Sequence, residues 1–137
     1  MCLRRTTVKI VAETDLLVYK CLDKRKYGYI TPFQYLRIDF DEDDTCLIKG
    51  GDGALQIEDV WYINKGVHAY VNKKRADRTS EQFKKDSGTQ THFAVIKKGS
   101  PYYIGDSEDV VTTELIVFRT KKAYKKYAEM HEVKNFE

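Results

Sequence analysis

The chain has 137 residues, 42% of them hydrophobic and 33% charged, so it carries enough apolar material for one folded domain and a disordered chain is excluded. Its net charge of +3, from 24 basic and 21 acidic residues, argues against a nucleic-acid-binding protein. We expect neither a secretory leader nor a membrane span, because the sequence contains no long apolar run.

The cysteines predict a protein of a reducing compartment. Cys2, Cys21 and Cys46 are odd in number and form no Cys-x-x-Cys pair, so neither a disulfide framework nor a zinc site is indicated. Reduced thiols are typical of the cytosol. We therefore expect a cytoplasmic protein without a bound metal.

Runs of apolar, β-branched and aromatic residues predict strands along most of the chain. In chain order, the predicted strands are residues 8–12, 16–22, 29–40, 45–49, 55–63, 66–71, 91–97, 102–105 and 110–119. Residues 16–22, 91–97 and 115–118 are apolar enough to be buried on at least one face. We expect these three segments to be the central strands.

Two segments have the pattern of helices. Residues 73–85 are permissive for a helix, and Asn72 can cap its start. Residues 121–132 predict a second helix, in which Tyr124 and Tyr127 share one side and lysines line the other. The lysines need water, so we expect the C-terminal helix to be peripheral.

The order of these elements predicts the fold class. The strands follow one another closely, with few helices between them, which favours an antiparallel arrangement over alternating βαβ units. We predict an α+β fold: a mostly antiparallel curved sheet with one short mid-chain helix and a C-terminal helix. Residues 1–120 form a single α+β domain in this prediction, and residues 121–137 form a C-terminal helix packed on it.

The sequence lacks the short motifs of common enzyme classes. It has no Gly-x-Ser-x-Gly, Gly-x-Gly-x-x-Gly or His-Glu-x-x-His pattern, and His68, His92 and His131 have no close metal-binding spacing. No cofactor is indicated by these patterns. Hydrolase, kinase and dehydrogenase activities therefore have no positive support.

Two glycine segments with aromatic residues are the best candidates for a site. They are Gly66-Val-His-Ala-Tyr70 and Lys97-Lys-Gly-Ser-Pro-Tyr-Tyr-Ile-Gly105, each at the end of a predicted strand, where side chains can project from a rigid base. Tyrosine can stack on a ligand and donate a hydrogen bond. The other interpretation is that the same residues pack in the core. The candidate ligand-binding residues are Tyr19, His68, Tyr70, Tyr102 and Tyr103.

These segments resemble a small uncharacterised family found in bacteriophages and Bacteroides-type genomes. Its members begin Met-Cys-Leu and carry a tyrosine-lysine strand, here Val18-Tyr-Lys20, besides the two glycine segments. The resemblance implies a phage-encoded protein in the host-cell cytoplasm, and the family has no established activity. We expect a non-catalytic binding protein whose partner is a small molecule or a host protein, and its oligomeric state is left open.

A weaker resemblance, in layout alone, is to ADP-ribosyltransferase-like folds. It implies an enzyme, or an inactive descendant of one, that takes the nicotinamide dinucleotide NAD as substrate. The three catalytic positions would fall on Lys20, Tyr70 and Glu114. The family has His or Arg at the first position, where this chain has lysine.

Overall fold

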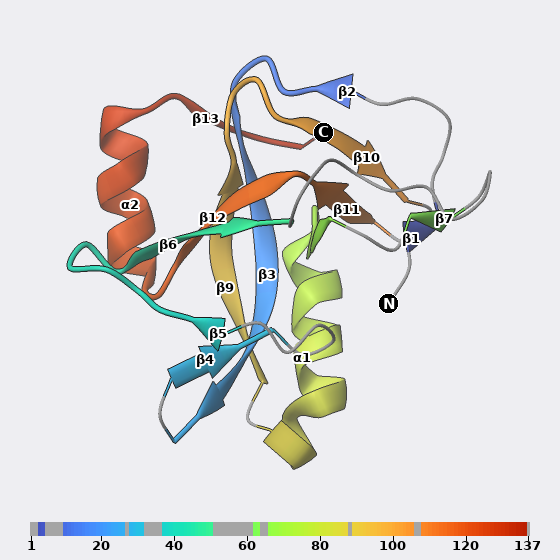
Figure 1. The fold of residues 1–137 in the computed structure, drawn as a ribbon, viewed down its shortest axis with the longest axis vertical. Coiled ribbons are helices and arrows are strands. Elements are labelled where there is room, and N and C mark those ends of the chain that lie inside the picture. Colours follow the sequence, from blue (N-terminus) through green and yellow to red (C-terminus); the bar gives the residue numbers. More distant parts are fainter. Residues whose placement is uncertain are drawn as a thin grey trace.

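The computed structural model shows a mostly antiparallel sheet with two helices (Figure 1). It describes residues 3–4, 10–26, 28–31, 37–50, 62–63, 66–87, 89–105 and 108–136. The strands are β1 (Leu3–Arg4), β2 (Ile10–Val11), β3 (Asp15–Arg25), β4 (Gly28–Ile30), β5 (Arg37–Ile38), β6 (Thr45–Lys49), β7 (Tyr62–Ile63), β8 (Val67–Tyr70), β9 (Thr89–Ile96), β10 (Pro101–Ile104), β11 (Asp109–Thr112), β12 (Glu114–Phe118) and β13 (Val133–Asn135). The helices are α1 (Lys73–Ser87) and α2 (Lys121–Met130).

In the described residues, eleven strands form one sheet, and β1 pairs with β7 in a separate one. The order along the main sheet is β2-β10-β11-β8-β3-β9-β12-β6. Strand β3 also pairs with β4 and β13, and β4 pairs with β5. The β13–β3 pair is parallel, whereas the others are antiparallel.

The three strands expected at the centre lie next to one another, as β3, β9 and β12. Their apolar side chains are removed from water: Val18, Ile96 and Leu115 are each 0% exposed. This burial supplies the main driving force that holds the sheet together. The prediction for residues 16–22, 91–97 and 115–118 is therefore confirmed.

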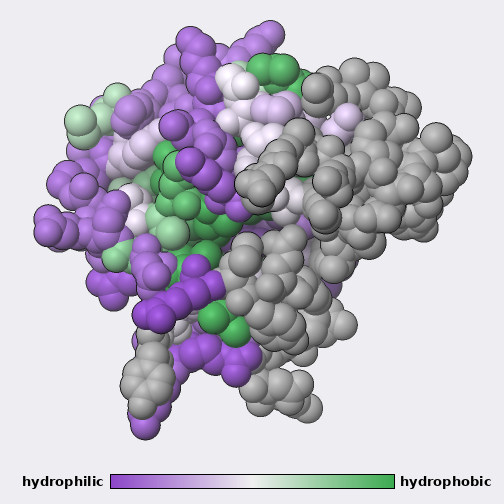
Figure 2. Space-filling model, viewed as in Figure 1, coloured by the Kyte–Doolittle hydropathy of each residue, from purple (hydrophilic) through white to green (hydrophobic). Residues whose placement is uncertain are grey.

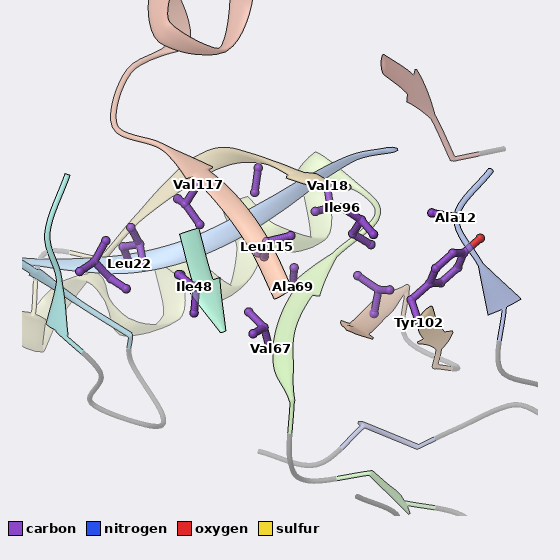
Figure 3. Close-up of a cluster of buried hydrophobic side chains, with 13 residues drawn as sticks. Ala12, Val18, Leu22, Ile48, Val67, Ala69, Ile96, Tyr102, Leu115 and Val117 are labelled. Carbon is purple, nitrogen blue, oxygen red and sulfur yellow. The ribbon is translucent and has the colours of Figure 1, made fainter. Parts of the chain in front are cut away.

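The two faces of the sheet have different roles. Directly opposed residues of an antiparallel pair share a face, so Val18 and Ala94 lie on one side and Tyr19 and Phe93 on the other. The inner face is the one that carries the main core cluster, in which side chains from β3, β6, β8 and β12 point toward one another (Figure 3). The outer face is the one that α1 and α2 cover.

Helix α1 begins where the sequence predicted. The Asn72 side-chain oxygen accepts hydrogen bonds from the backbone N–H groups of Lys74 (2.8 Å) and Arg75 (3.3 Å), which confirms the predicted N-cap. Ala76 is fully buried against the outer face, and its carbonyl accepts a hydrogen bond from the Cys21 thiol at 3.4 Å. A small residue at this position lets the helix lie close to β3.

Helix α2 is peripheral, as predicted, because none of its residues is buried. The Thr120 hydroxyl caps its start by accepting from the Ala123 N–H at 3.2 Å. Tyr124 contacts the rings of Phe93 and Phe118, and Tyr127 donates to Asp15 at 2.6 Å. Polar residues cover the left side of Figure 2, where α2 lies in Figure 1. The helix ends at Met130, and the chain then forms β13 beside β3.

Several predicted elements differ in their bounds. Within residues 110–119, the strand expected at residues 115–118 is β12, and the residues before it form a separate strand, β11, because β11 pairs with β8 and β10 whereas β12 pairs with β6 and β9. In the predicted strand 29–40, residues 32–36 lie outside the described residues, and so do residues 8–9 and 55–61 of two other predicted strands. Within the described residues, neither helix is long and apolar enough to cross a membrane.

Candidate functional site

The strand register divides the five sequence-predicted binding residues between the two faces. Tyr70 pairs with Tyr19 across β8 and β3, and His68 lies two residues from Tyr70 on the same strand. Tyr103 pairs with Val111, which pairs with His68. These four candidates therefore lie on the outer face. Tyr102 is adjacent to Tyr103 on β10 and lies on the inner face, in the main core cluster.

On the outer face, Tyr70 is covered by α1 and does not offer an open surface. It is 6% exposed, packs with Cys21 and Ala76, and lies beneath the Arg75 guanidinium at 5.9 Å from its ring centre. Burial raises the pKa of Tyr70, so its hydroxyl stays protonated at neutral pH. Tyr19 is half-buried, and its ring packs on Phe93 at 5.6 Å.

His68 and Tyr103 lie two strands apart on the same face, separated by Val111. Neighbouring strands are about 4.8 Å apart, so the two backbones are roughly 10 Å apart at this row. His68 is half-buried, whereas Tyr103 is almost fully buried. The row thus contains a histidine whose two ring nitrogens are buried, beside a packed tyrosine.

The three residues of the ADP-ribosyltransferase-like layout do not converge. Lys20 pairs with His92 on the inner face, whereas Tyr70 lies on the outer face under α1. Glu114 is half-exposed at the start of β12, opposite Lys49. Because the sheet separates the first residue from the second, these side chains do not meet in one cleft.

Lys20 is nevertheless an unusual group. It is almost fully buried, and its ammonium donates a hydrogen bond to the His68 carbonyl at 2.5 Å. Strand β3 meets β8 only at Tyr19 and Tyr70 in the described ladder, so the Lys20 side chain crosses the gap where the two strands separate. Burial lowers the pKa of Lys20 to about 8, because a charged amine is poorly solvated there.

The largest of the described clefts is a groove of about 810 Å³ near the C-terminus. It lies where β13, β2 and β10 come together (Figure 1). We call it the C-terminal groove. It is lined by Ile10, Val11, Glu13, Thr14, Leu16, Tyr102, Ile104, Val133, Lys134, Asn135 and Phe136.

Apolar side chains of the inner face form much of this lining. Leu16 pairs with Ile96 of the core cluster, and Ile104 pairs with Val110 of the same cluster. The Tyr102 ring contacts the Phe136 ring edge to face, with centres 5.5 Å apart. The groove therefore continues the core toward solvent and offers an apolar wall with two aromatic rings.

Polar groups lie beside this wall. The Tyr102 ring extends toward Ala12, with its hydroxyl at the far end (Figure 3). Burial, and after it the negative charge of Glu13, raise the pKa of Tyr102. The hydroxyl is therefore protonated at neutral pH and can donate or accept a hydrogen bond.

Two smaller clefts lie elsewhere. One of about 320 Å³ is at the start of α1, between Tyr19, Lys73 and Phe136. The other, of about 420 Å³, lies between α2 and the start of β6, and Tyr127 and His131 stack along it with ring centres 4.1 Å apart. Across the described ranges, no group of three or more His, Cys, Asp or Glu side chains could hold a metal ion.

The structure thus adds residues that the sequence did not indicate. Glu13 lies between two predicted strands, and Phe136 lies after the helix predicted at residues 121–132. Only Tyr102 of the sequence-predicted site lines the C-terminal groove. Local patterns could not reveal the other residues, because the groove forms where residues 10–16 meet residues 133–136.

No protein-family model, curated protein or solved structure matches the chain. Its function is therefore inferred from its own residues.

Proposed function

We propose that the chain is a non-catalytic binding protein and that the C-terminal groove takes a small molecule. The observation that supports this most is the groove itself: about 810 Å³ of space next to the core, lined by apolar side chains together with at least as much polar surface. Small-molecule sites have this size. Both other described clefts are about half this volume or less.

We further infer that the main sheet is curved in an α+β fold and that the groove lies at its open end. The main path of the sheet has eight strands in order, and neighbouring strands twist by about 20° to 25° relative to one another, so the twist accumulates along the path.

The placement of Lys20, Tyr70 and Glu114 favours binding over ADP-ribosyl transfer. A transferase must hold its catalytic groups around one substrate within hydrogen-bond reach, whereas two of these lie on opposite faces of β3 and β8. We include in the proposal the setting that the sequence resemblance implies, a phage-encoded protein in the host cytoplasm. In the alternative version of this proposal, the chain binds a host protein instead of a small molecule.

A ligand screen with two matched variants tests the proposal. Metabolites and nucleotides are screened by thermal shift on the wild type, because a ligand at 100 times its Kd adds about 2.7 kcal/mol of stability. Each hit is then measured on Val11→Trp, which fills part of the groove, and on Leu47→Trp. Both residues are exposed apolar residues on edge strands, but Leu47 lies on β6, away from the groove.

We expect hits to lose their stabilising effect in Val11→Trp and to keep it in Leu47→Trp. Tyr102→Phe and Tyr103→Phe add a second comparison, because these neighbours face opposite sides of β10. Tyr102→Phe should weaken binding and Tyr103→Phe should not. A screen without a stabilising ligand, or hits that survive Val11→Trp and disappear in Tyr103→Phe, would contradict the groove as the site.

A further inference from the structure

The described charged residues that line the C-terminal groove differ in whether they have an ion-pair partner. Its two charged lining residues are Glu13 and Lys134. Lys134 is 3.7 Å from the carboxylate of Glu132, so its positive charge already has an opposite neighbour. Glu13, in the connection between β2 and β3, has no ion-pair partner within the described residues. Among the described residues, the groove therefore presents one carboxylate without an ion-pair partner.

Two aromatic rings, Tyr102 and Phe136, also line the groove. The faces of aromatic rings attract cations, because the ring quadrupole is negative there. Tyr102 and Phe136 pack edge to face, so their ring planes are nearly perpendicular, at 88°. Glu13 and Tyr102 both line the groove, and burial, followed by the negative charge of Glu13, raises the pKa of the Tyr102 hydroxyl.

We propose that the C-terminal groove binds an organic cation, a protonated amine with an apolar body. Its ammonium group would pair with the Glu13 carboxylate and hydrogen-bond to the Tyr102 hydroxyl, and its body would pack on Leu16, Ile104 and Phe136. This inference rests on the proposed binding function and names the chemical class of its ligand. Anionic ligands such as free phosphate are repelled by the Glu13 carboxylate, so the proposal predicts that they bind less tightly.

Three probes of one shape and different charge test the inference. They are 2-(1-naphthyl)ethylamine, 2-(1-naphthyl)ethanol and 3-(1-naphthyl)propionate, titrated into the full chain by calorimetry or NMR. The proteins are the wild type, Glu13→Gln, and Glu129→Gln as control, since Glu129 is an exposed acid on α2 outside the groove lining. An exposed ion pair together with a cation–π contact predicts that the amine binds about 3-fold to 30-fold tighter than the alcohol.

Support for the inference is this preference in the wild type and in Glu129→Gln, its loss in Glu13→Gln, and unchanged affinity for the alcohol in all three. Equal binding of the amine and the alcohol, or a preference for the amine that survives Glu13→Gln, would overturn the proposal that the ligand is a cation. Either result would leave the groove as a binding site. Binding of none of the probes at millimolar concentration also overturns the inference. The proposed function is judged separately, by the effect of Val11→Trp on the hits of the screen.

Discussion

At the scale of single residues, Lys20 has a defined energetic role. Its ammonium group is buried and bonded to a neutral carbonyl, that of His68. A buried cation is costly unless it is paired. The cost appears as the lowered pKa of Lys20, about 8 in the folded chain against 10.5 for an ordinary lysine.

This pKa predicts how stability depends on pH. Between about pH 8 and 10.5 the unfolded chain binds more protons at Lys20 than the folded chain does, so the free energy of unfolding contributed by this residue rises with pH. Below pH 8 both states are protonated and the penalty is constant. In Lys20→Met this dependence is absent. The stability of the variant relative to the wild type should therefore fall by roughly 2 to 3 kcal/mol from pH 7 to pH 10.

Urea unfolding at pH 7 and pH 10 measures the difference in the free energy of unfolding between Lys20→Met and the wild type. The other titrating groups are present in both proteins, so their contributions cancel from this difference. Lys24→Met is the matched control, because Lys24 is on the same strand but exposed. Its relative stability should not change with pH. A Lys20→Met difference that is the same at both pH values would show that the amine is solvated in the folded chain.

Residues 102 and 103 show what the sequence could not decide about the site. Alternation along a strand predicts that Tyr102 and Tyr103 face opposite sides. Both are 8% exposed, so burial does not distinguish them either. Which of them faces the groove depends on the pairing of β10 with β2 and β11, a long-range contact that composition does not encode.

At the scale of elements, the contact between α1 and the outer face of the sheet gives a direct test of packing. Ala76 is 0% exposed, beside Cys21 and Tyr70 on the outer face. Ala76→Leu inserts a larger side chain where no space is left, and overpacking of this kind costs about 1 to 3 kcal/mol. Arg78→Leu, at an exposed position of the same helix, should change stability by less than about 0.5 kcal/mol. Chemical unfolding of both variants measures the contrast, and equal effects would contradict the close contact of α1 with β3.

The C-terminal helix leads to a second prediction. Deletion of residues 121–137 removes α2 and β13 but no fully buried side chain of α2. It exposes the rings of Phe93 and Phe118 and removes the Tyr127–Asp15 hydrogen bond. We expect the shortened chain to fold cooperatively with roughly 2 to 5 kcal/mol less stability. Loss of a cooperative thermal transition would show that α2 belongs to the core.

The elements that were predicted well are those with strong local signals. Strands β3, β9 and β12 come from dense apolar and aromatic runs, and α1 follows the Asn72 cap. Two features were not predictable locally. The break at Thr113 occurs inside a continuous strand-like run, because the chain changes partners there. Strand β13 has three residues and forms only by pairing with β3 at the other end of the sequence.

At the scale of the whole molecule, segments far apart in the sequence create the site: residues 10–16, 102–104 and 133–136. Strand β2 is the edge of the main sheet, and β13 returns to β3 after the helix. Their side chains meet in the C-terminal groove, next to the core that the central strands form. The fold could be outlined from the strand pattern, but the groove depends on contacts between residues more than 80 positions apart, such as Tyr127 with Asp15 and Lys98 with Asp15.

The position of a bound ligand tests the central claim most directly. Methyl NMR spectra of protein labelled at Ile, Leu and Val are recorded with and without the tightest-binding naphthyl probe. The groove predicts the largest shift changes at Ile10, Val11, Leu16, Ile104 and Val133, which line it. The methyl groups of Val111, which lies on the outer face between His68 and Tyr103, should change little. The largest change at Val111 would place the ligand beside His68 and Tyr103 and contradict the account.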